Sequence, residues 1–327
     1  MTDERAKPGA ADEHIVEELL TRLTSVPNDA RSFDVTVEEA SRLYPVGVRF
    51  LDRVRARGLC EEQEGTELFE RTDLINVELF LGRGAATMSL RRFWPATLKR
   101  VQAPAPAGYL VEFRAACPDP GHPGDCEYSL VLPGGRQQVR VERSASERPI
   151  AHVRVECPTE WPDLPESARE IIDELCGVTF VRLPWKLGHV LDDIAFVRRT
   201  GLGDCEAATK LLVKCGAERG VPIRQSFGLM LAPPFALKHY WPEVLVDDVW
   251  VPIEPLLMKA MVEWRALDPA QWAPYRSPGA ALWRRAVEWW DVSVRHNGKV
   301  VEASYRAEVV PDPSCGPSGQ THRLVGQ

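Results

Sequence analysis

One cysteine of the chain lies where a thiol can become a nucleophile. Cys205 directly follows a glycine-rich turn, GLGD at 201–204, and opens a strongly apolar helical pattern. Backbone N–H groups and the positive end of a helix dipole favour the thiolate at such a position, and the same N–H groups can hold an oxyanion. We therefore predict that Cys205 attacks an acyl carbon and forms a thioester.

A thiolate nucleophile needs a base and a group that orients the base. His239 lies 34 residues after Cys205 and begins a strand-like run, and Glu254 lies 15 residues further on. A hairpin that turns at Asp247 and Asp248 would bring the imidazole and the carboxylate side by side. The expected site is a catalytic triad of Cys205, His239 and Glu254. Asp247 and Asp248 are the alternatives to Glu254.

Four motifs in this region resemble those of the transglutaminase-like superfamily, which has a papain-like core. They are GDC at 203–205, GVPIR at 220–224, HYWPEV at 239–244 and WVPIEP at 250–255, and the resemblance covers roughly residues 165–260. It implies an α+β fold with Cys205 as nucleophile, His239 as acid and base, and Glu254 as the orienting carboxylate, where the family usually has aspartate. It also makes Trp185 the candidate indole beside the oxyanion.

Two enzyme classes share this chemistry up to the thioester. An amine that resolves the thioester gives an amide, whereas water gives a peptidase or amidase. We expect an acyltransferase that forms an amide bond, as the resemblance to bacterial enzymes of specialised-metabolite biosynthesis implies. Its acyl donor would be a carrier-protein thioester, a peptide or a small molecule. The alternatives are a cytoplasmic cysteine peptidase or amidase of the same fold, and a noncatalytic regulatory or binding protein. No cofactor and no metal are expected.

The composition is that of a folded protein with about two domains. The chain has 327 residues, 44% of them hydrophobic, and a formal net charge of -7, which argues against nonspecific binding to polyanions. The charged N-terminus lacks the apolar segment of an export signal, and no apolar run approaches the roughly 20 residues that cross a bilayer. We therefore expect a cytoplasmic protein with reduced cysteines and no membrane partner.

The first hundred residues show mostly helical periodicity. Apolar residues recur at helical spacing in four segments, at 14–23, 36–44, 46–59 and 67–82. The run from 37 to 74 resembles the winged-helix domain of MerR-type regulators. Residues 35–100 carry eleven Lys or Arg and ten Asp or Glu, a balance that is unsuited to duplex binding. We expect this helix-turn-helix-like region to dock a protein partner or to serve as a scaffold, and not to bind nucleic acid.

After the helical region, the hydrophobic pattern changes to a period of two residues. This alternation predicts four antiparallel strands, at 108–116, 127–135, 136–144 and 149–157. The longest loop between them holds Cys117, His122 and Cys126, which would ligate zinc if Cys157 or His152 came close. Because their spacing matches no standard zinc knuckle, we interpret this segment as a Pro/Gly-rich surface loop without a metal.

The larger, C-terminal region begins at a WPDLPES linker. Helical patterns are present at 166–175, 192–199 and 206–219, and Asn297-Gly298 predicts a hairpin turn near the end. Cys176 and Cys215 lie in apolar patterns and are expected to be core residues, and Arg224 is expected to make a structural hydrogen bond. The predicted parts are a flexible tail at 1–13, a helical winged-helix-like region at 14–104, a small antiparallel β region at 105–160, a transglutaminase-like catalytic domain at 161–310 and a flexible tail at 311–327.

Overall fold

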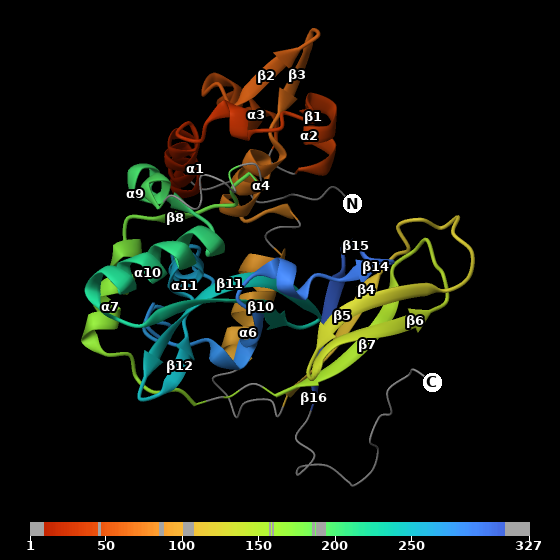
Figure 1. Cartoon of the computed structure of the whole chain (residues 1–327). Coiled ribbons are helices and arrows are strands. Elements are labelled where there is room, and N and C mark those ends of the chain that lie inside the picture. Colours follow the sequence, from red (N-terminus) through yellow and green to blue (C-terminus); the bar gives the residue numbers. More distant parts are fainter. Residues whose placement is uncertain are drawn as a thin grey trace. The chain divides into compact units, whose positions relative to one another are not determined.

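The computed structural model describes residues 10–44, 47–84, 88–100, 108–156, 158, 160–184, 187 and 194–310. Helices and antiparallel sheets are both present, which confirms the α+β class (Figure 1). The chain forms two compact units, and each combines stretches from more than one of the predicted parts. The first unit contains the described residues of Met1–Pro95, Glu166–Val221 and Glu254–Arg276, and the second those of Ala96–Pro165, Pro222–Ile253 and Ser277–Gln327.

The N-terminal part of the first unit is a helix, a short strand, two helices, a hairpin and a further helix (Figure 1). The elements are α1 (Ala10–Leu23), η1 (Asn28–Ala30), β1 (Val35–Thr36), α2 (Val37–Leu43), α3 (Val48–Ala56), β2 (Cys60–Gln63), β3 (Thr66–Phe69) and α4 (Arg71–Phe80). The three strands form a sheet in the order β1-β3-β2. Two expectations need correction: α1 includes residues 10–13 of the expected tail, and β3 replaces the first turn of the helix expected over 67–82.

Side-chain hydrogen bonds fix this N-terminal part to the rest of the first unit. The buried amide of Asn76 on α4 donates to the carbonyl of Arg182 at 2.8 Å and accepts from the Arg182 N–H at 2.7 Å. Arg22 of α1 donates to the carbonyl of Gly177 at 3.1 Å. A buried amide whose donor and acceptor are both satisfied holds two segments in one geometry. The N-terminal helices are therefore docked, and not a separately tethered module.

The remaining elements of the first unit are mainly helical. They are η2 (Met88–Phe93), α7 (Glu166–Ile172), η3 (Asp173–Leu175), β8 (Thr179–Phe180), α9 (Ala195–Thr200), β9 (Leu202–Gly203), α10 (Cys205–Arg219) and α11 (Pro255–Glu263). Strands β8 and β9 pair in parallel immediately before α10. Cys215 is buried on α10, as predicted. Cys176, also predicted to be a core residue, is instead exposed at the end of η3.

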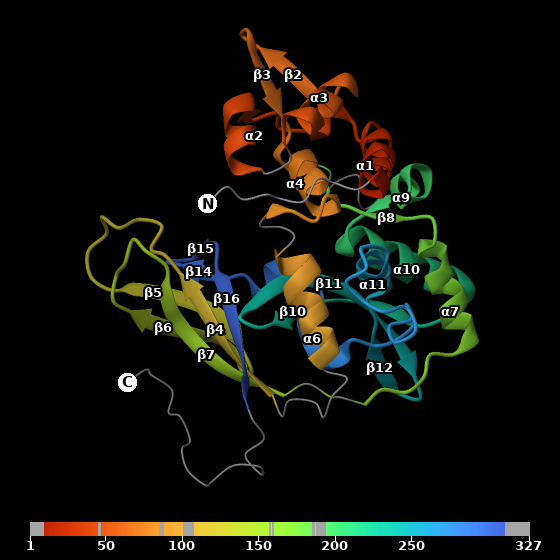
Figure 2. The same ribbon diagram turned by 180° about the vertical axis from the view of Figure 1, so that it is seen from behind.

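The second unit contains two antiparallel sheets (Figure 2). The seven-stranded sheet has the order β13-β10-β11-β16-β4-β7, with β12 on β11, and the four-stranded sheet has the order β15-β14-β5-β6. The strands expected over 108–157 all form. As expected, β4 pairs with β7 and β5 with β6, but the two pairs belong to different sheets, in which β4 also pairs with β16 and β5 with β14. The strands are β4 (Gly108–Ala115), β5 (Cys126–Leu132), β6 (Gly135–Val141), β7 (Arg148–Val155), β10 (Ile223–Ala232), β11 (Phe235–Val246), β12 (Val249–Pro252), β13 (Leu282–Ala286), β14 (Arg295–His296), β15 (Lys299–Val300) and β16 (Ser304–Val310).

Three short helical segments complete the chain. They are η5 (Gly279–Ala281) and η6 (Trp289–Val292) in the second unit, and α6 (Trp94–Arg100), which crosses the boundary between the units. The core of the second unit lies under β4, β5, β7 and β16, and its members include Phe113, Tyr128 and Tyr305. The β14–β15 hairpin turns at Asn297 and Gly298, both at positive φ, as the sequence predicts.

Candidate functional site

Cys205 is the first residue of α10, as its sequence context predicts. Asp204 caps the helix, since its Oδ1 accepts the Ala207 N–H at 2.9 Å. Gly203 is buried before the cap, and a Cβ at this position would lie only 3.2 Å from Val178 Cγ1. The half-buried Cys205 side chain therefore sits where the first backbone N–H groups of a helix have no partner within the helix and the helix dipole is positive.

Glu254 begins another helix of the same unit. It is the N-cap of α11, its Oε1 accepts the Leu257 N–H at 3.2 Å, and its side chain is 3% exposed. Leu256 lies two residues after Glu254, and Gly203 lies two residues before Cys205. These two residues are close, since a Cβ on Gly203 would lie 3.8 Å from Leu256 Cδ2. The starts of α10 and α11 are therefore neighbours within the first unit.

His239 belongs to the second unit, where it lies in the middle of β11 opposite Gly228 of β10. Its side chain is 3% exposed, and its ring stacks with that of Trp241 on the same strand face at a centroid distance of 6.3 Å. A Cβ at Gly228 would lie 2.0 Å from the Trp283 carbonyl oxygen and 2.8 Å from the Trp241 indole. This part of the sheet therefore requires glycine beside the histidine.

The predicted hairpin after His239 forms, and it distinguishes the carboxylate candidates. Strands β11 and β12 pair from Glu243 opposite Pro252, and the Ile253 N–H, immediately before Glu254, donates to the Pro242 carbonyl at 3.0 Å. Asp247 and Asp248 are exposed at the turn, eight residues or about 25 Å along the strand from His239. This distance excludes both as partners of His239. Glu254 is the better candidate, and contact between His239 and Cys205 stays a prediction.

Other motif residues have structural partners. Glu243 is buried and pairs with Arg224 at 2.6 Å, and it accepts a hydrogen bond from Trp241 Nε1 at 3.3 Å. The Arg224 guanidinium lies over the Trp250 ring, 4.2 Å from its centroid. The expectation that Arg224 makes a structural hydrogen bond is confirmed. Trp185, the expected indole beside the oxyanion, lies outside the described residues.

Burial changes the ionisation of two carboxyl groups in the first unit. It raises the pKa of the Asp204 cap to about 6, against the opposing effect of the Ala207 N–H. Burial also raises the pKa of Asp73 to about 6, although Arg31 pairs with it at 2.8 Å. In both cases removal of water from around the charged form outweighs the favourable partner. The carboxyl group next to Cys205 is therefore costly to ionise.

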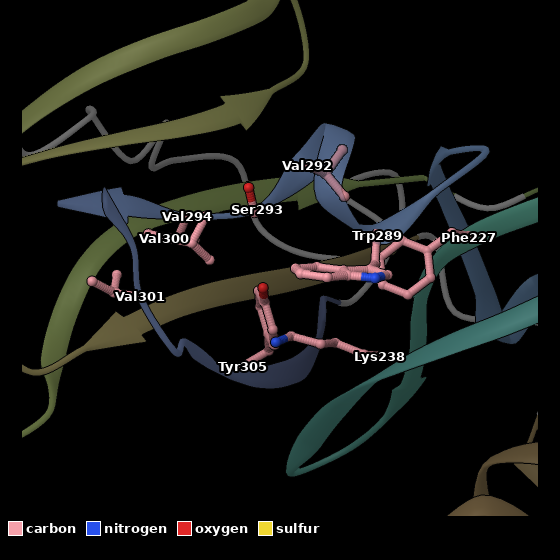
Figure 3. Close-up of a pocket in the computed structure, with 9 residues that line it drawn as sticks. All are labelled: Phe227, Lys238, Trp289, Val292, Ser293, Val294, Val300, Val301 and Tyr305. Carbon is pink, nitrogen blue, oxygen red and sulfur yellow. The ribbon is translucent and has the colours of Figure 1, made fainter. Parts of the chain in front are cut away.

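A small pocket of about 30 Å³ lies in the second unit, and none of the predicted site residues lines it (Figure 3). Lys238, Trp289 and Tyr305 are among its lining residues. Because Lys238 directly precedes His239 on β11, the two side chains point to opposite faces of the strand. The pocket has room for about two waters and not for an acyl substrate. It therefore gives no support to a substrate site.

A cluster of thiols and imidazoles lies elsewhere in the second unit. One ligand atom from each of Cys117, His122, Cys126 and His296 lies within 4.8 Å of the others. The sequence did not predict His296 as a member of this group. It offered Cys157 or His152 as the further ligand, and Cys157 lies outside the described residues. His152 instead pairs with Glu112 at 3.0 Å. We call these four residues the Cys/His cluster.

Comparisons of the chain with protein-family models, curated proteins and solved structures find no match. Within the part of the chain that the structure describes, no helix combines the length and apolar character needed to traverse a bilayer.

Proposed function

We propose that the chain is a transglutaminase-like cysteine acyl-transfer enzyme that forms an amide through a thioester on Cys205. The observation that carries the proposal is the position of Cys205 at the capped start of α10, with the start of α11 and its cap Glu254 beside it. The order of the four sequence motifs supports the same assignment. We call Cys205, His239 and Glu254 the proposed triad.

In the proposed reaction, the Cys205 sulfur attacks the acyl carbonyl carbon and His239 takes the thiol proton. The N–H groups at the start of α10 stabilise the oxyanion. The leaving group departs with the proton from His239, and the acyl group stays on sulfur as a thioester. An amine then attacks this thioester, gives its proton to His239 and releases the Cys205 thiolate. Glu254 orients the imidazole through one carboxylate oxygen while the other caps α11.

Charge pairing in the N-terminal part supports a protein partner over nucleic acid. Arg55 of α3 forms two hydrogen bonds with Glu67 at 2.6 Å, and Arg53 and Arg57 pair with Glu17 at 3.2 Å and 2.9 Å. Cations already neutralised by carboxylates gain little from phosphates. This arrangement argues against a nucleic-acid partner, and the partner that we propose for the N-terminal region is a protein, such as a carrier of the acyl donor.

The test is limited alkylation of the full chain with iodoacetamide between about pH 5 and 9, with peptide mapping. We expect Cys205 to react at least about tenfold faster than the exposed Cys176 near pH 6, because the N–H groups at the start of α10 and the proposed base His239 favour attack by its sulfur. The variant His239→Ala should remove this advantage. His152→Ala, which changes a histidine of the second unit outside the proposed triad, should retain it.

Equal alkylation of Cys205 and Cys176 in the wild type would contradict the proposal. So would an advantage of Cys205 that persists in a folded His239→Ala protein. If the faster alkylation of Cys205 is confirmed, the enzyme is incubated with thioester donors and amine acceptors. Mass spectrometry then distinguishes amide products from acid products. Acid alone would assign the chain to the peptidase and amidase class.

A further inference from the structure

We propose that Cys117, His122, Cys126 and His296 form a structural zinc site in the second unit. The four residues come from a loop and two strands that pair with each other. Cys117 and His122 lie in the loop after β4, Cys126 begins β5, and His296 ends β14, which pairs with β5. None of them belongs to the proposed triad, so the zinc site and the proposed function stand or fall separately.

The distances between the donor atoms fit a tetrahedral ion. Zinc bonds of about 2.3 Å to sulfur and 2.0–2.1 Å to nitrogen place tetrahedral donors about 3.3–3.8 Å apart. His122 Nε2 lies 3.5 Å from Cys126 Sγ, and His296 Nε2 lies 4.0 Å from Cys117 Sγ. With all four atoms within 4.8 Å of one another, shifts of a few tenths of an ångström to about 1 Å would complete the tetrahedron.

The chemistry of the donors favours zinc over other common ions. Two thiolates and two imidazoles are a borderline-soft set that suits Zn²⁺ and is poor for Mg²⁺ or Ca²⁺, which prefer oxygen. Cys117, Cys126 and His296 are 4%, 1% and 4% exposed. Binding releases two thiol protons to solvent, and the two thiolates then balance the charge of the ion. A neutral complex is compatible with this burial.

Hydrogen bonds and ring contacts around the cluster orient its imidazoles. The His122 Nδ1 lies 2.9 Å from the Pro123 carbonyl, which can only accept, so Nδ1 carries the proton and the Nε2 lone pair faces Cys126. Such a hydrogen bond to a carbonyl is the usual support of a metal-binding histidine. The Tyr128 ring packs against the His296 ring, with 5.0 Å between the ring centroids.

Four protein ligands leave no open position, so the ion would be structural and not catalytic. Its role follows from the backbone. No helix or strand forms between Ala115 and Cys126, whereas the core of the unit lies directly beneath both cysteines. A zinc ion would fasten this loop to β14, which is 179 residues from Cys117 along the chain. A disulfide would join the two cysteines but would leave the two histidines without a role.

The test is the metal content of the full chain, expressed with zinc in the medium and purified without chelator. We expect about one zinc per chain in the wild type and less than a tenth of that in Cys126→Ser and in His296→Ala, because each removes one of four ligands. Cys60→Ser and His152→Ala are matched controls outside the cluster and should keep the ion. Zinc retained in both ligand variants, or lost equally in the controls, would overturn the site.

Cobalt substitution tests the wild type directly, in case a ligand variant does not fold. Co²⁺ bound here should give the intense visible bands of a tetrahedral complex together with thiolate-to-cobalt charge transfer, and one equivalent of Zn²⁺ should abolish both. The weak spectrum of an octahedral ion would exclude the site. A metal-free protein with a Cys117–Cys126 disulfide after non-reducing purification would exclude it equally.

Discussion

The proposed triad and the Cys/His cluster contain similar groups, but the chain positions them differently. Cys205 and Glu254 each begin a helix of the first unit, and His239 lies on a strand of the second. The cluster lies wholly in the second unit, where the pairing of β14 with β5 brings His296 to the two cysteines. In the proposed triad, part of the reactivity expected of Cys205 comes from its local backbone, and the rest requires His239. In the cluster, the proposed zinc binding depends entirely on convergence of the four donors.

This difference determines what can be inferred from each. A helix start activates a thiol wherever that helix lies, because the N–H groups and the dipole belong to the helix itself. A zinc site requires four donor atoms within about 4 Å of one another, and the sequence around a single donor does not indicate that the others lie nearby. Variants of the proposed triad and of the Cys/His cluster should therefore respond differently.

The largest expected effect is on the cluster. A chelator should raise the alkylation rate of Cys117 and Cys126 by about 100-fold or more, because removal of zinc frees both buried sulfurs and releases the loop that the ion fastens. The rates of Cys60 and Cys176, outside the cluster, should change less than about twofold. Peptide mapping before and after chelation gives all four rates. Unchanged alkylation rates at Cys117 and Cys126 would show that the two residues are buried thiols that hold no metal.

The strand that carries His239 should be nearly as sensitive. Gly228→Ala places a Cβ against the Trp283 carbonyl and the Trp241 ring, and we expect it to lower the free energy of unfolding by about 3 kcal/mol. The matched control is Gly177→Ala, since nothing lies within 4 Å of a Cβ there and its φ is negative. Denaturant unfolding of both variants measures the difference. Equal stability would show that β10 and β11 do not hold His239 in the register described.

The sequence predicted features that depend on neighbouring residues. The start of α10 at Cys205, the β11–β12 hairpin and the Asn297-Gly298 turn all have local signals, and all form. The β2–β3 hairpin was missed because its charged residues also suit a helix, and only Glu64 and Gly65, both at positive φ, form its turn.

The fourth ligand of the cluster could not be predicted for another reason. His296 directly precedes the hairpin turn at Asn297, but spacing does not show that β14 pairs with β5. The strands of the expected β region form, and β4 pairs with β7 and β5 with β6, but the further partners β16 of β4 and β14 of β5 lie more than 150 residues away. Periodicity gives the face that a strand buries and carries no information about which strand lies beside it. The role proposed for His239 would depend on the same kind of long-range placement.

The free energy of unfolding of the wild type should depend on pH through Asp204, the cap before Cys205, and the variant Asp204→Asn should lack this dependence. The pKa of Asp204 is about 6 in the folded protein against 3.8 as its ordinary value, so the wild type loses stability as pH rises from about 4 to 6. Asp204→Asn keeps the helix cap and removes the charge. Its advantage in unfolding free energy should be near zero below about pH 3 and reach about 1–2 kcal/mol above pH 7, allowing for partial solvent exposure. A constant difference across this range would contradict the assignment.

The smallest expected change in stability separates the two roles of Glu254. In Glu254→Gln the amide oxygen still accepts the Leu257 N–H, so we expect the free energy of unfolding to change by less than about 1 kcal/mol. The lost charge should nevertheless lower the alkylation rate of Cys205 several-fold near pH 6, because an imidazolium without its carboxylate stabilises the thiolate less well. Glu254→Ala removes both functions and should lower stability further. If Gln and Ala reduce stability equally and neither changes Cys205, Glu254 is only a helix cap, and the orienting group of the triad must be sought outside Glu254, Asp247 and Asp248.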